Sequence, residues 1–199
     1  MQRKQQRNHE ISKAIIEIKQ VLKEEVSVQT LEQAKAIMLS LALRRDLFQW
    51  ADFPLPNEKE VFRTFLVHQE EDGAYALYVN SSLPGQFSPP HDHGGSWAIV
   101  VAVEGEELHK VYRRNERKIQ KLSSPISQVG EILVEPGNGI SILPEGIHSI
   151  QMKSDVPLLH LHLYAKGFEY QGERNEYNLE TGEVKCFKLE EVGLIEDAR

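Results

Sequence analysis

The stretch from 88 to 107, SPPHDHGGSWAIVVAVEGEE, places two imidazole side chains two residues apart, on His91 and His93. Along a β-strand, residues i and i+2 point to the same face, so both rings can reach one metal ion. Taken alone, such a pair is equally compatible with imidazoles that bind only carbonyl groups or water. We predict that both rings lie at the start of the strand formed by the apolar run and point into a barrel.

A third imidazole, that of His148, lies in GISILPEGIHSI, where a proline and a glycine predict a tight turn leading into a strand. Closure of a barrel would bring His148 opposite the first pair. His160 and His162 form a second H-x-H pair, and one of them is an alternative third ligand. By the strand period, His160, His162 and Tyr164 share one face, which is either the wall of a site or a polar patch on an exposed strand.

If a third imidazole joins the pair, three neutral imidazoles would leave a divalent ion with its full charge and with open coordination positions. Imidazole suits iron, zinc, copper and nickel, and a facial arrangement with open positions suits Fe(II) oxygen chemistry. Gly94 and Gly95 are expected to leave room for a small substrate beside the metal. Pro89 and Pro90 are expected to stiffen the segment that leads to His91. His9, His68 and His109 have no motif around them and are expected at the surface.

Two helices are predicted before these segments, because apolar residues recur at helical spacing from about residue 9 to 47. The second helix is expected to begin at Thr30, since TLEQ matches a capping box with Thr30 as the N-cap and Gln33 at the third helical position. Its apolar stripe is either a partner-binding groove or, as we expect, a face packed on the rest of the protein. The stripe consists of Leu31, Ala34, Met38 and Leu41.

The prolines of FPLPNEKE break the helical pattern. Short apolar or alternating runs follow, and at least eight strands without intervening helices predict a β-sandwich or barrel. We therefore expect a helical segment at 1–55, packed on a β-barrel domain at 56–199. The predicted strands lie at 61–68, 74–80, 96–104, 106–114, 118–123, 131–136, 139–144, 148–154 and 157–165, with a last hairpin around NLETGEVKCFKL.

Composition narrows the function classes. The chain has 199 residues, 40% of them hydrophobic and 27% charged, and a net charge of −7, which argues against a general nucleic-acid binder. No window approaches the ~18 apolar residues of a membrane span, and the polar N-terminus lacks the apolar core of a secretory signal. Cys186 is the single cysteine, so no intrachain disulfide can form. We expect a cytoplasmic monomer or homodimer, with Cys186 as a half-buried apolar side chain.

The first histidine segment resembles the first cupin motif, G-x5-HxH-x3,4-E-x6-G. Gly85, His91, His93 and Gly105 stand at the matching positions, but Ala98 stands at the glutamate position. The second segment resembles the second motif, G-x5-PxG-x2-H, although its histidine follows one residue sooner. The resemblance covers roughly residues 60 to 170. It implies a double-stranded β-helix, or jelly-roll, barrel whose metal is held by three histidines without a carboxylate.

Among three-histidine cupins, the chain resembles the cysteine dioxygenase-like thiol dioxygenases. Members carry HDH in the first motif and a late S-x-H-x-Y strand; here the late strand has His160 in place of the serine. The resemblance implies Fe(II) on His91, His93 and His148. It also implies oxidation of a small thiol by O2 to the sulfinic acid, with cysteine or a compound like 3-mercaptopropionate as the substrate.

The same resemblance implies a relay from His160 through His162 to the Tyr164 phenol, which faces the substrate. It gives Arg63 the role of holding the substrate carboxylate. Some members link the tyrosine to a cysteine through a thioether; Ala98 occupies that cysteine's position, so the crosslink should be absent. Two alternatives remain: another metal-dependent cupin enzyme, or a cupin that binds a small molecule without turnover.

Overall fold

The computed structural model describes residues 2–57, 60, 62–115, 124–153, 155–189 and 195–198. Its two helices are α1 (Gln2–Val21) and α2 (Val28–Ala42). The N-cap of α2 is Ser27 rather than the predicted Thr30. Ser27 N donates a hydrogen bond to Thr30 Oγ1 at 2.9 Å, and Thr30 N donates to Ser27 Oγ at 3.3 Å. The capping box therefore exists, but Thr30 is its third helical residue, because Ser27 supplies an equally good cap one turn earlier.

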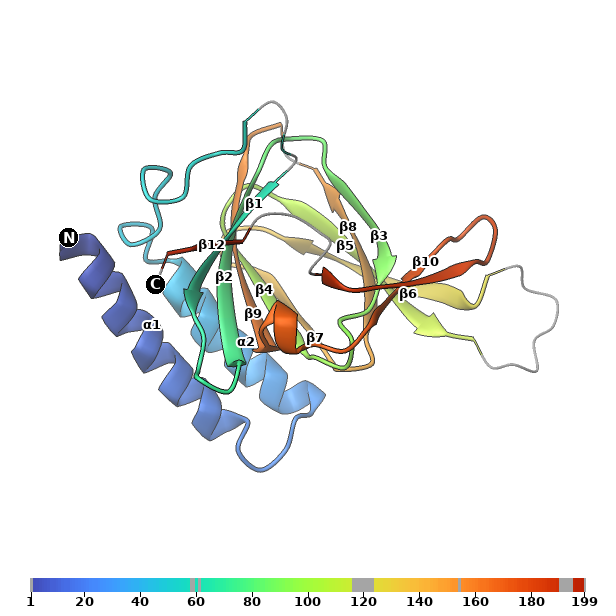
Figure 1. The fold of residues 1–199 in the computed structure, drawn as a ribbon, viewed down its shortest axis with the longest axis horizontal. Helices are drawn as coiled ribbons and strands as arrows, with labels where there is room; N and C mark the ends of the chain where they lie inside the picture. Colours follow the sequence, from blue (N-terminus) through green and yellow to red (C-terminus); the bar gives the residue numbers. More distant parts are fainter. Residues whose placement is uncertain are drawn as a thin grey trace.

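The described strands form two six-stranded sheets, ordered β12-β1-β2-β9-β4-β7 and β11-β10-β3-β8-β5-β6. Strands β2 and β9, β3 and β8, β4 and β7, and β5 and β6 pair antiparallel. The pairs are thus nested like those of one long hairpin, with β5 and β6 innermost, and they alternate between the two sheets (Figure 1). This is a jelly-roll, or double-stranded β-helix, topology, and the predicted fold class is confirmed. The strands are β1 (Phe62–His68), β2 (Ala74–Ser82), β3 (Phe87–His91), β4 (Ala98–Glu104), β5 (Glu107–Arg114), β6 (Ile126–Val134), β7 (Gly139–Ile142), β8 (Ile147–Met152), β9 (Leu158–Lys166), β10 (Arg174–Tyr177), β11 (Val184–Phe187) and β12 (Ile195–Asp197), with a 3₁₀ turn η1 (Phe168–Tyr170) after β9.

Strand β3 was not among the predicted strands, because Pro89 and Pro90 lie within it. The pairing of β3 with β8 shifts register between Ser88 and His91, and this bulge accommodates the two prolines. The predicted strand at 118–123 lies outside the described residues. The predicted last hairpin is present as β10 and β11.

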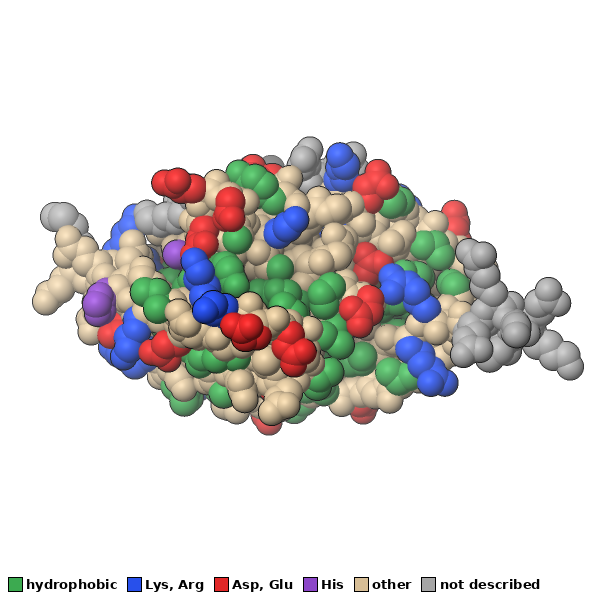
Figure 2. Space-filling model, turned by 90° about the horizontal axis from the view of Figure 1, so that it is seen from below, with side chains coloured by type: hydrophobic (Ala, Val, Ile, Leu, Met, Phe, Trp, Pro, Cys, Tyr) green, Lys and Arg blue, Asp and Glu red, His purple; other side chains and the backbone are tan. Residues whose placement is uncertain are grey.

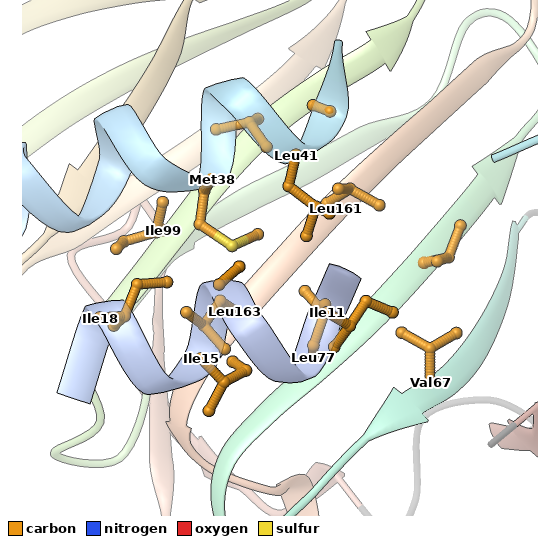
Figure 3. Packing of buried hydrophobic residues seen from close by; sticks show 14 of the residues in the cluster. Ile11, Ile15, Ile18, Met38, Leu41, Val67, Leu77, Ile99, Leu161 and Leu163 are labelled. Carbon is orange, nitrogen blue, oxygen red and sulfur yellow. The ribbon is translucent and has the colours of Figure 1, made fainter. Parts of the chain in front are cut away.

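Both faces of the central sheet strands are buried. Leu159, Leu161 and Leu163 of β9 pack against α1 and α2, whereas the alternate residues of the same strand face the barrel interior. Figure 3 shows Met38 and Leu41 of α2 lying over the barrel strands that carry Leu161 and Leu163. The predicted apolar stripe of α2 is fully buried in this cluster, so it is a packing face, as expected.

The C-terminal hairpin of β10 and β11 extends the second sheet beside β3 and projects away from the helices (Figure 1). Cys186 lies on its edge strand and is exposed, contrary to the half-buried position that we expected. Acidic and basic side chains are interspersed over the face of the molecule seen in Figure 2. Among the described residues, neither helix combines the length and apolarity needed to cross a bilayer.

Candidate metal centre

Three buried imidazoles converge inside the barrel. The ligand nitrogens of His91, His93 and His148, which we call the histidine triad, lie within 4.8 Å of one another. His93 Nε2 and His148 Nε2 are 3.1 Å apart. Two nitrogens about 2.0–2.1 Å from one ion are separated by roughly 2.8–3.4 Å for ligand angles between 90° and 109°. The triad therefore fits a divalent transition-metal ion.

The triad is assembled from two strands and a loop. His91 is the last residue of β3, and His93 lies in the loop before β4, which begins only at Ala98. We predicted that both rings lie at the start of the strand formed by the apolar run, which is β4, and this prediction is therefore wrong. His148 lies on β8 directly opposite His91. Convergence depends on this cross-strand pair and on the loop that bends His93 back towards it.

Asp92 anchors that loop. Its Oδ1 accepts hydrogen bonds from Gly94 N at 3.2 Å and Asn175 N at 3.1 Å. Its Oδ2 accepts from Arg114 and from the Asn175 side chain, both at 2.9 Å. The middle residue of HDH thus ties the loop that carries His93 to β10.

Gly94 has a different role from the one predicted. Its φ is +58°, and a Cβ there would lie 2.3 Å from Gly172 O. Gly172 N also donates a hydrogen bond to Gly94 O at 3.1 Å. Glycine is therefore required for close approach of two backbone segments, and not to clear space for a substrate.

Hydrogen bonds assign the protons of two triad imidazoles when the rings are neutral. His91 Nδ1 lies 2.8 Å from Pro89 O and donates to it, which leaves a lone pair on Nε2. His109 Nε2 donates to Glu107 Oε2 at 3.0 Å, so His109 Nδ1 accepts from His148 Nδ1 at 2.9 Å. His148 Nε2 then carries a lone pair as well. The buried position of His109 contradicts our expectation of a surface residue.

Burial sets the charge of these groups. It lowers the pKa of His91 to about 4, with a further contribution from the positive charge of Arg174. Burial also holds the pKa of His93 and of His148 well below the ordinary value. Around neutral pH the triad is therefore uncharged, which is the protonation state that binds metal.

The triad adjoins a cavity of about 540 Å³. His91, His162, Tyr164 and Arg174 are among the side chains that line it. The Tyr164 ring centre lies 5.4 Å from that of His93, and the Tyr164 hydroxyl lies 3.4 Å from His162 Nδ1. Burial raises the pKa of Tyr164, so the phenol keeps its proton and can donate it in a hydrogen bond.

His160 lies deeper than the predicted relay requires. Its ring centre is 6.5 Å from that of His162, and neither His160 nitrogen has a hydrogen-bond partner among the described residues. His160 Nδ1 instead lies 3.1 Å from Glu107 Oε1. The structure thus brings His162 and Tyr164 together but does not join His160 to them by a hydrogen bond. The alternative third ligands, His160 and His162, lie in a separate group with Glu107.

Two arginines differ in their relation to the cavity. Arg63 lies over the Phe65 ring at 5.3 Å and is not among the described residues that line the cavity. Arg174 lines it, is 4% exposed, and lies 5.6 Å from the Tyr164 ring centre. Sequence reasoning did not identify Arg174, because no motif surrounds it. Glu107, His109 and Asp92 were missed for a different reason, since their roles depend on contacts between strands.

Several solved structures are similar in fold. The protein TT1209 from Thermus thermophilus is 24% identical, with a TM-score of 0.42 over 56% of this chain and 88% of that one. The Schizosaccharomyces pombe Cnp3 cupin domain is 11% identical, with a TM-score of 0.43 over 57% and 71%. A conserved protein with a double-stranded β-helix domain from Klebsiella pneumoniae is 15% identical, with a TM-score of 0.43 over 65% and 89%. No protein-family model and no curated protein matches the sequence. Such similarities concern the fold alone, so the function is inferred from the residues of the site.

Proposed function

We propose that the protein is a non-haem Fe(II) dioxygenase that oxidises a small thiol to its sulfinic acid. The observation that carries this proposal is the histidine triad, with Ala98 at the position of a carboxylate ligand and a cavity lined by Tyr164 and Arg174. Three neutral imidazoles leave the ion its full charge, which favours an anionic thiolate as a further ligand.

The iron, when bound, lowers the pKa of the thiol and supplies the redox chemistry with O2. The overall reaction is RSH + O2 → RSO2⁻ + H⁺. Both oxygen atoms form bonds to sulfur, the sulfur is oxidised by four electrons, and O2 accepts those electrons. No further reductant is needed, and only the thiol and O2 must enter the cavity.

Residues of this chain would bind and orient the thiol. Arg174 is a buried cation in the cavity wall, and its planar guanidinium suits a substrate carboxylate. The protonated phenol of Tyr164, held beside His162, would donate a hydrogen bond to the substrate. Cysteine and 3-mercaptopropionate each carry a carboxylate near the thiol, so either fits this arrangement.

We also propose that the reaction takes place in the cytoplasm, where thiols remain reduced, and that the protein acts as a monomer or homodimer. A single cysteine agrees with such a compartment.

The test is metal analysis of protein purified without oxygen, followed by O2 electrode traces with a panel of thiols. The panel contains cysteine, 3-mercaptopropionate and cysteamine. We expect iron to support thiol-dependent O2 uptake and sulfinate formation, and His148→Ala to lose both iron and uptake. Zinc-loaded protein as the native form, with no O2 uptake after iron loading, would favour a hydrolytic cupin enzyme. A tightly bound ligand without turnover would favour a binding protein.

A further inference from the structure

We propose that Glu107, His160 and His162, the Glu107 cluster, form a second binding site for a divalent transition metal. The three side chains come from β5 and β9, and they share no residue with the histidine triad. The proposal concerns metal binding and does not depend on the dioxygenase reaction.

The distances within the cluster are those of potential ligands. One ligand atom from each of the three side chains lies within 4.8 Å of the other two. His160 Nδ1 and Glu107 Oε1 are 3.1 Å apart, which is the separation of two adjacent ligands on one ion. His160 is 0% exposed, and Glu107 and His162 are each 5% exposed. Two imidazoles and a carboxylate therefore meet where water has little access.

Unsatisfied ring nitrogens point to a missing ligand. Among the described residues, neither nitrogen of His160 has a hydrogen-bond partner, and His162 Nε2 has none. His160 Nδ1 lies 3.1 Å from Glu107 Oε1, the distance of an ion pair, but it forms no hydrogen bond there. Buried polar atoms are rarely left unpaired, because desolvation then goes uncompensated. A metal ion would satisfy a lone pair on each ring.

The contacts around the cluster leave suitable atoms free. Glu107 Oε2 accepts a hydrogen bond from His109 Nε2 at 3.0 Å, so Oε1 remains for a metal. The Tyr164 hydroxyl lies beside His162 Nδ1, so Nε2 of that ring remains. Each of these two ligands is thus oriented by a neighbour on its other polar atom, as is common around protein metal sites.

The ligand set and the cavity define the class of ion. Two imidazoles and one carboxylate suit Fe(II), Zn²⁺ and similar ions, and they leave open coordination positions. Glu107 and His162 line the same cavity as His91 of the triad, so an ion could enter by the route a substrate uses. The chain from Glu107 through His109 to His148 then connects the two sites by hydrogen bonds.

The experiment is a titration of the full-length, metal-free protein with Co²⁺ and, separately, with Zn²⁺. Calorimetry and the visible absorption of Co²⁺ report the number of ions bound. We expect two equivalents for the natural protein and one for His91→Ala, which keeps the Glu107 cluster. Glu107→Gln and His160→Asn should each bind one, whereas His9→Asn, on the exposed face of α1, should bind two.

Circular dichroism spectra and melting curves identify the variants that remain folded; stoichiometry is read from the folded member of the Glu107→Gln and His160→Asn pair. A single equivalent in the natural protein would overturn the proposal. Retention of two equivalents in both Glu107→Gln and His160→Asn would also overturn it. A natural protein that binds two equivalents of metal but shows no thiol-dependent O2 uptake would contradict only the proposed dioxygenase function.

Discussion

The Nδ1 atoms of His109 and His148 lie 2.9 Å apart, and both rings are fully buried. Since Glu107 accepts a hydrogen bond from the other nitrogen of His109, a buried carboxylate controls the tautomer of His148 through one intervening ring. The orientation of the His148 imidazole is thus set by two residues outside the histidine triad, as is common for the neighbours of metal ligands.

Replacing His109 with Phe should weaken metal binding at the triad. The substitution keeps a ring in the same space but removes the acceptor for His148 Nδ1–H. Loss of a residue that hydrogen-bonds to a metal ligand typically changes metal affinity roughly 10–100-fold. Competition with a chelator, using Zn²⁺, measures the change, and His9→Phe is the control on an exposed residue. Unchanged affinity in His109→Phe would show that the tautomer of His148 is set elsewhere.

Replacing Arg174 with Gln should weaken binding of thiols that carry a carboxylate. Loss of a buried charge-assisted hydrogen bond typically costs roughly 1.5–3 kcal/mol, or about ten- to a hundredfold in affinity. Cysteamine, which lacks a carboxylate, should bind as before. The sequence-based hypothesis gave this role to Arg63, so Arg63→Gln is the matched variant. The KM of each thiol, measured with both variants, shows which arginine binds the carboxylate. A selective loss in Arg63→Gln alone would restore the sequence-based assignment.

Replacing Tyr164 with Phe should lower the rate of O2 consumption while iron content stays near normal. The ring packing is kept, and only the hydroxyl beside His162 is removed. We expect a decrease of roughly 10–100-fold in kcat. The intact mass of the natural protein should show no loss of two hydrogens at Tyr164, because Ala98 cannot form a thioether. Full activity in Tyr164→Phe would leave the phenol without a role in turnover.

The metal-free protein should lose stability as the pH falls from about 6.5 towards 4. Burial lowers the folded-state pKa of His91 to about 4 and that of His162 to about 3, from 6.5. Over this window the unfolded chain binds more protons than the folded chain, so acid favours unfolding, and the full stability is present above about 6.5. At 1.36 kcal/mol per pKa unit, the loss is on the order of a few kcal/mol. Urea unfolding at pH 7, 6 and 5 tests this, and His91→Asn should flatten the dependence. A constant free energy of unfolding from pH 7 to 5 would contradict it.

Replacing Asp92 with Asn should destabilise the loop that carries His93. The new amide would place N–H groups against donors from Arg114 and Asn175, which now meet a carboxylate oxygen. We expect a loss on the order of 3 kcal/mol in the free energy of unfolding, together with weaker metal binding. Asp46→Asn, which alters an exposed ion pair with Arg44, should cost less than about 1 kcal/mol. Equal effects of the two substitutions would argue against the anchoring role of Asp92.

Alternation along the strands predicts a β-sandwich or barrel, because it is a local pattern. The resemblance to the two cupin motifs implies the jelly-roll topology and selects His148, rather than His160 or His162, to join His91 and His93. Sequence reasoning misplaces the first pair, since Pro89 and Pro90 argue against a strand that the β3 bulge nevertheless permits. Periodicity also places Tyr164 and His162 on one face correctly, and the leucines between them face the helices.

The remaining parts of the site depend on contacts distant in the chain. His109 is buried because β5 pairs with β8 and brings it beside His148, a relation that no local pattern encodes. Arg174 reaches the cavity because β10 pairs with β3. Periodicity within a segment predicts which face is inward, but the identity of the neighbouring strand decides what that face meets.

The attachment of Asp92 to Asn175 has a consequence for biosynthesis. The two residues are 83 positions apart, and Gly94 meets Gly172 over a similar span. During translation the loop that carries Asp92 and His93 is made long before the segment that holds it in place. A nascent chain that ends before β10 therefore lacks the Asn175 contacts of Asp92. We expect the triad to acquire metal only after the segment that carries Gly172 and Asn175 has left the ribosome, and a chain terminated before that segment to be released without metal.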